Sequence, residues 1–73
     1  MSTSVRAHIT GTVWKIEVAV GDTVAEGQTL VILESMKMEM PVEAPAAGQV
    51  TAILTKEGAS VEEGAVLVEL ESR

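Results

Sequence analysis

Short apolar runs alternate with glycine-marked turns along the chain. The runs are rich in valine, isoleucine and threonine, and no stretch shows the apolar spacing between caps that a helix requires. This pattern predicts an all-β chain, because glycine adopts turn conformations easily while β-branched residues favour strands. We expect strands at residues 5–8, 12–18, 29–35, 38–44, 49–55 and 66–71, with short bridges at 23–24 and 60–61.

The second half of the chain repeats the first. After a shift of 37 positions, residues 47–72 align with residues 10–35 without a gap, and 12 of the 26 paired positions are identical. Neither half is long enough to bury a core of its own. The repeat therefore predicts two similar halves related by an internal pseudo-two-fold axis. The glycines recur in register, as the pairs Gly11/Gly48, Gly21/Gly58 and Gly27/Gly64.

The repeat also predicts which side chains face inward. Ile32 aligns with Glu69, so both should face solvent while their neighbours lie in the core. The expected inward residues are Val31, Leu33, Val68 and Leu70. Val13 and Ile16 differ in parity, so burial of both requires a β-bulge between them. Trp14, the only Trp, Tyr or Phe in the chain, is expected to be a partly buried packing residue.

The two central strands are separated by Met36 and Lys37 alone. A two-residue turn there pairs Ser35 with Met38, Glu34 with Glu39, and Leu33 with Met40. Methionine and lysine are not the residues that such turns prefer, and a turn that departs from local preference is a candidate functional site. A lysine at a hairpin tip offers a long, mobile stem and an amine that forms an amide with a carboxyl group.

Shifting the same pairing by 37 positions predicts a second contact. The N-terminal strand should lie antiparallel to the C-terminal strand, with Val5 opposite Val68 and Arg6 opposite Leu67. The two ends of the chain should then meet at the pole of the domain opposite Lys37.

The segment ESMKMEMPVEAPAAGQV resembles the biotin-attachment segment of biotin-dependent carboxylases. The pattern Gly-Asp-x-Val-x-x-Gly-Gln from Gly21 to Gln28 is similarly typical of the biotinyl/lipoyl attachment family. The resemblance covers essentially the whole chain, and it is greatest to the small, free-standing biotinyl attachment proteins of bacteria. It implies a single domain over residues 1–73. The implied fold is a flattened barrel-sandwich hybrid of two four-stranded antiparallel sheets.

The resemblance implies a biotin carboxyl carrier rather than an enzyme. In such a carrier a biotin protein ligase attaches biotin to Lys37, with Met36 and Met38 as flanking recognition residues. The carrier then shuttles carboxybiotin between a biotin carboxylase and a carboxyltransferase.

The sequence departs from the family pattern at two points. Ser35 stands where many biotin domains have alanine, and the gapless repeat leaves no room for the protruding thumb of some acetyl-CoA carboxylase carriers.

Composition narrows the expected partners. The net charge is −6 and the acidic residues are spread out, which argues against nucleic acid as a ligand. No apolar stretch approaches the roughly 20 residues of a membrane-spanning helix. The chain has no cysteine, which fits a reducing compartment, and one histidine, His8. We therefore expect a cytoplasmic monomer with no metal site and no catalytic residues.

Two alternatives remain open at this point. A lipoyl carrier would share the fold and the modified lysine, but such domains typically have an acidic residue before the lysine and a small one after it. Met36 and Met38 occupy those places here. An unmodified adaptor domain would have no need of an exposed lysine between two methionines. The sequence leaves the acceptor substrate open.

Overall fold

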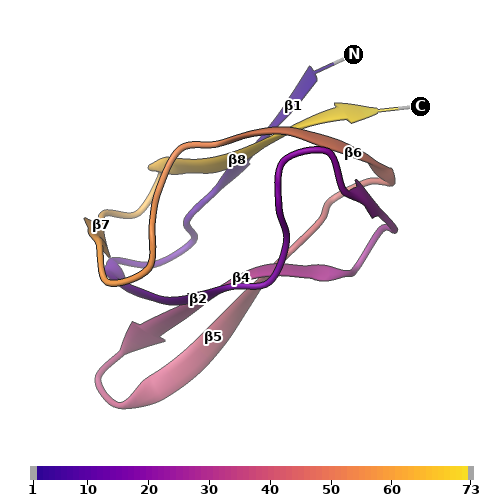
Figure 1. The fold of residues 1–73 in the computed structure, drawn as a ribbon. Coiled ribbons are helices and arrows are strands. Elements are labelled where there is room, and N and C mark those ends of the chain that lie inside the picture. Colours follow the sequence, from indigo (N-terminus) through magenta and orange to yellow (C-terminus); the bar gives the residue numbers. More distant parts are fainter. Residues whose placement is uncertain (1, 73) are drawn as a thin grey trace.

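The structure is a computed structural model that describes residues 2–72, and these residues contain strands but no helix. Eight strands form two four-stranded antiparallel sheets, which confirms the predicted fold class (Figure 1). The strands are β1 (Ser2–Arg6), β2 (Gly11–Ile16), β3 (Thr23–Val24), β4 (Thr29–Ser35), β5 (Met38–Glu43), β6 (Gly48–Ile53), β7 (Ser60–Val61) and β8 (Val66–Ser72). We call the sheet with order β1-β8-β6-β3 the terminal sheet and the sheet with order β5-β4-β2-β7 the hairpin sheet.

The two halves interlock through their turns. When residue numbers are shifted by 37, each strand of the hairpin sheet falls on a strand of the terminal sheet, and the order of the strands is the same in both sheets. The turn and loop hydrogen bonds repeat in the same way: the Gly21 amide donates to the Val50 carbonyl, and the Gly58 amide donates to the Val13 carbonyl. Each half thus supplies acceptors for the other half's turns, so the halves form one cooperative unit.

The core is built from repeat pairs. Its largest fully buried side chains are Leu30/Leu67, Val31/Val68, Leu33/Leu70 and Val13/Val50. Ile32 and Glu69, between these inward residues, are half-buried and face outward, as predicted. No polar or charged side chain is buried among the described residues. Burial of each of these aliphatic side chains contributes about 1.5–3 kcal/mol before the entropy cost of folding.

The bulge predicted between Val13 and Ile16 is present, and the second half has its copy. The register of β2 against β4 shifts between Val13 and Lys15, and that of β6 against β8 shifts between Val50 and Ala52. A bulge sets two residues of one strand against one of its partner. As a result Val13 is buried and Ile16 packs against the core, while Trp14 and Lys15 are both exposed.

The first and last strands pair as the shifted hairpin predicts, with one correction. Val5 lies opposite Val68, but Arg6 lies opposite Val66 instead of Leu67, because the register shifts between Val5 and Arg6. The strand expected at 5–8 runs from Ser2 to Arg6. Met1 and Arg73 lie outside the described residues. The paired outer ends of β1 and β8 lie far from the β4–β5 turn, at the other end of a molecule 35 Å long (Figure 1).

Candidate functional site

The β4–β5 hairpin has the geometry that its sequence predicts. Ser35 pairs with Met38, and Leu33 pairs with Met40, which leaves Met36 and Lys37 as the two turn residues. Their φ angles are 52° and 65°, and both are therefore left-handed. A type I′ turn requires positive φ at both positions and usually meets this requirement with asparagine and glycine. Among residues 2–72 no other non-glycine residue has a positive φ.

The tip of the hairpin is open to solvent. Met36 is 92% exposed, Met38 is 61% exposed, and Lys37 between them is exposed as well. Within the described part of the chain no hydrogen bond or ion pair holds the Lys37 ammonium group. The turn projects beyond the neighbouring strand β2 (Figure 1). The Lys37 side chain is therefore accessible to a protein that would modify it.

The base of the hairpin is held in place by close packing. Leu33 is fully buried. Gly11 on the adjacent strand lies so close to β4 that a Cβ atom on it would come within 2.6 Å of the Glu34 carbonyl oxygen. The exposed lysine is therefore carried on a closely packed support. The sequence flagged Gly11 only as a repeated glycine, because its close approach to β4 is a contact between strands that is distant along the chain.

The other two lysines have different surroundings. Lys15 lies on strand β2, where its Nζ atom is 5.7 Å from the centroid of the Trp14 ring. Lys56 lies in the loop after β6, and its carbonyl accepts a hydrogen bond from the Ala59 amide. Of the three lysines, Lys37 alone lies in a turn with positive φ.

The motif from Gly21 to Gln28 closes two turns. The Asp22 carboxylate accepts a hydrogen bond from the Ala19 amide, and the Gln28 side-chain oxygen accepts one from the Ala25 amide. The aligned positions in the second half, 59 and 65, are alanines, so the backbone alone closes the corresponding turns there. This motif therefore has a structural role.

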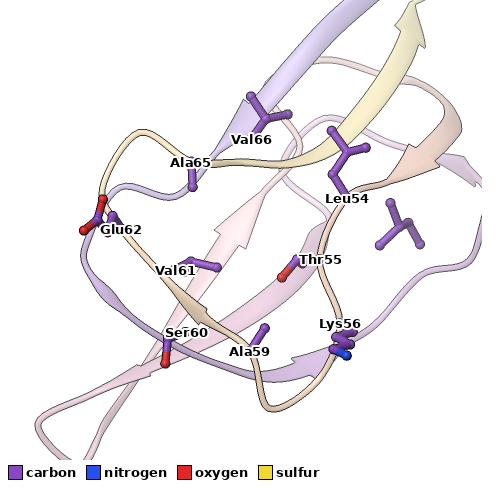
Figure 2. Close-up of a pocket in the computed structure, with 10 residues that line it drawn as sticks. Leu54, Thr55, Lys56, Ala59, Ser60, Val61, Glu62, Ala65 and Val66 are labelled. Atoms are coloured by element: carbon purple, nitrogen blue, oxygen red, sulfur yellow. The ribbon is translucent and has the colours of Figure 1, made fainter.

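A groove of about 610 Å³ opens in the second half. Figure 2 shows Leu54, Thr55 and Lys56 along one side of it and Val61 and Glu62 along the other. At the positions aligned with Thr55 and Val61 the first half has Val18 and Val24, which are buried. These two positions are thus more deeply buried in the first half than in the second, and the groove carries no nucleophile–base pair.

Residues 2–72 contain neither a cluster of metal-ligating side chains nor a membrane-spanning helix. No group of three or more His, Cys, Asp or Glu side chains is arranged to hold a metal ion. No helix of the described segment has the length and apolar character needed to cross a membrane.

Comparison with known proteins bears on this hairpin. The sequence model described as "Biotin-requiring enzyme", of the biotin/lipoyl family, matches residues 1–70. The chain belongs to this family. It is 46% identical over 67 residues to a biotin/lipoyl attachment protein of Bacillus subtilis, a match that covers 92% of each chain. It is 48% identical over 62 residues to a biotin carboxyl carrier protein of Streptococcus mutans, where the match covers 85% of this chain and 48% of that protein.

A solved structure agrees with these sequence matches. Urea carboxylase of Kluyveromyces lactis superposes with a TM-score of 0.92 and 38% identity over 97% of this chain and 6% of that chain. The chain thus spans most of the B. subtilis relative but a small part of a whole carboxylase. The family's description names biotin, and a single exposed lysine amine at a hairpin tip fits a cofactor that is held through an amide.

Proposed function

We propose that this chain is a biotin carboxyl carrier in which Lys37 holds biotin through an amide. The observation that supports this most directly is the exposed, unpaired Lys37 amine in a left-handed turn at the end of a projecting hairpin. Biotin bound there supplies a group that accepts a carboxyl group at one enzyme site and gives it up at another. The chain's own residues position that group and perform no chemical step themselves.

The proposed partners act in turn on the same arm. A biotin protein ligase joins the biotin carboxyl group to Lys37 Nζ with loss of water, driven by ATP, and the resulting amide removes the ammonium charge. A biotin carboxylase and a carboxyltransferase then receive the arm. Met36 and Met38, whose side chains are mostly exposed beside the lysine, offer apolar contact to whichever enzyme receives the tip. We propose a monomer that works in the cytoplasm.

The test is intact mass after co-expression with a biotin protein ligase. One biotin adduct is expected on the wild-type chain and none on Lys37→Arg, because arginine keeps the charge but does not form this amide. Lys15→Arg and Lys56→Arg are matched controls and should be labelled like wild type. Labelling that persists in Lys37→Arg would exclude Lys37 as the attachment site.

A lipoyl carrier is the second candidate, since the B. subtilis relative is named for both cofactors. The side chains at the tip disfavour it, because bulky methionines flank the lysine. The same mass measurement in cells that hold both a biotin ligase and a lipoyl ligase separates the two, because the two adducts differ in mass. A lipoyl adduct on Lys37 would keep the site but replace the proposed cofactor.

A further inference from the structure

The outer face of the hairpin sheet carries an apolar patch. Val31 and Leu33 are fully buried, so Ile32 between them faces outward. Ile32 lies directly opposite Lys15 on β2 and Pro41 on β5, so the three residues form a row across adjacent strands. Trp14 lies beside this row in the bulge, 46% exposed, with the Lys15 ammonium group over its ring. We call Trp14, Ile32 and Pro41 the outer patch.

The repeat supplies an internal comparison for the outer patch. The 37-residue shift takes Trp14, Ile32 and Pro41 onto Thr51, Glu69 and Ser4 of the terminal sheet. There the Ser4 hydroxyl donates a 2.9 Å hydrogen bond to the Glu69 carboxylate, and the face is polar. The same fold position is therefore compatible with polar side chains. The stability of the fold therefore does not explain why the side chains of the outer patch are apolar.

The outer patch is continuous with the hairpin that presents Lys37. Ile32 and Pro41 lie on the two strands that end at the turn, and Ser35 is three residues beyond Ile32. At about 3.3 Å per residue this is a distance of roughly 10 Å along the strand. A protein that covers the outer patch therefore has the Lys37 arm at the edge of the same interface. Tryptophan is also the residue type most enriched among the energetically dominant contacts of protein interfaces.

We propose that the outer patch is the docking surface for the biotin protein ligase. This inference rests on the proposed function. The ligase is the one enzyme of the cycle that meets the chain before biotin is attached, so protein surface alone must distinguish Lys37 from Lys15 and Lys56. Carboxylates at 34, 39 and 43 share the outward parity of the patch and border it. The ligase surface that fits has an apolar pocket for the Trp14 ring, an acidic group beside it for Lys15, and a basic rim for these carboxylates.

The test measures KM and kcat of a biotin protein ligase for the purified unbiotinylated chain, with biotin and ATP in excess. The variants take the residues that the terminal sheet already uses: Trp14→Thr, Ile32→Glu and Pro41→Ser. Removal of a dominant contact should raise KM about tenfold and leave kcat close to wild type. Thr51→Ala and Glu69→Gln on the terminal sheet are the matched controls, and their KM should change by less than about twofold. Thermal melting of each variant separates docking from folding. If Ile32→Glu unfolds, the exposed positions 14 and 41 decide the matter.

Three outcomes overturn the proposal. An unchanged KM for Trp14→Thr and Pro41→Ser shows that the ligase does not use this face. A lower kcat at constant KM shows an effect on the chemical step instead of docking. Normal biotinylation with impaired later carboxylation assigns the outer patch to the carboxylase. If the wild-type chain itself takes no biotin, the proposed function fails, and this result is distinguishable from all three.

Discussion

Met36→Asn should make the domain more stable and a poorer substrate. Met36 is held at φ 52°, and the left-handed region costs a non-glycine residue about 1–2 kcal/mol. Asparagine adopts this region more easily, because its short side chain hydrogen-bonds to the nearby backbone, and it is favoured at the first position of a type I′ turn. Met36 is 92% exposed, so its replacement removes almost no buried surface.

The expected gain is about half of that penalty, roughly 0.5–1 kcal/mol, which raises the melting temperature of a domain of this size by about 2–8 °C. Met36→Ala is the matched control. Alanine also lacks the methionine side chain but carries the same left-handed penalty, so its stability should stay within about 0.5 kcal/mol of wild type. Both variants should be biotinylated more slowly, because both lack the methionine beside Lys37.

The measurements are thermal and urea unfolding of the unmodified chain, together with initial rates of biotin incorporation. If Met36→Asn is no more stable than Met36→Ala, the turn is not strained in the way its φ angles indicate. If Met36→Ala unfolds at a much lower temperature, Met36 is a packing residue and not a recognition residue.

Three further predictions concern the residues that flank Lys37 and the packing that holds the hairpin and the core together. The double variant Met36→Ala with Met38→Ala should lose carboxyl transfer more than stability, with a cost within roughly 0.5–3 kcal/mol; a collapse of its melting temperature would count against a recognition role. Leu70→Ala should show the reverse, losing about 2–5 kcal/mol in urea unfolding because it leaves a cavity in the core, with biotin incorporation retained below the melting temperature. Gly11→Ala should cost about 1–3 kcal/mol in the same assay, because its Cβ meets the Glu34 carbonyl oxygen; wild-type stability would show that β2 and β4 separate easily.

The repeat made most of the fold predictable. A gapless shift of 37 relates every strand to a copy, so the hairpin pairing of Leu33 with Met40 also predicts that Val5 faces Val68. The parity of Val13 and Ile16 predicts the bulge, because a strand without a bulge does not bury both. The failure at Arg6 has a cause that both halves share. The sequence predicts an ideal register, but the hairpin register shifts between Thr29 and Val31, and the copied register shifts between Val5 and Arg6. Arg6 therefore lies opposite Val66 just as Glu43 lies opposite Thr29.

The sequence predicts where the candidate site lies along the chain, but it predicts less well which side chains form the surface around it. Lys37 stands out because it falls between the two halves and in a turn that its neighbours do not favour. Trp14 was expected to be partly buried as a packing residue. It is exposed, because strand alternation does not determine how two adjacent bulge residues divide between inside and outside. The predicted hairpin already implies that Ile32 lies opposite Pro41, but only the observed bulge in β2 sets Lys15 opposite Ile32 and brings Trp14 beside this row.

In this chain, residue positions that are identical in the two halves serve folding, whereas some positions that differ between the halves serve function. The halves agree at positions that form the core and the turns, such as Leu33/Leu70 and Gly21/Gly58. The fold needs the same residue at these positions in both halves. Difference alone does not mark a functional site, since Asp22 and Gln28 differ from their copies Ala59 and Ala65 and serve only to close turns. The positions of the outer patch also differ between the halves, but they face outward and adjoin the Lys37 turn. The fold accepts polar residues at the copies of the outer patch, so the apolar residues on the hairpin sheet are explained by what docks there.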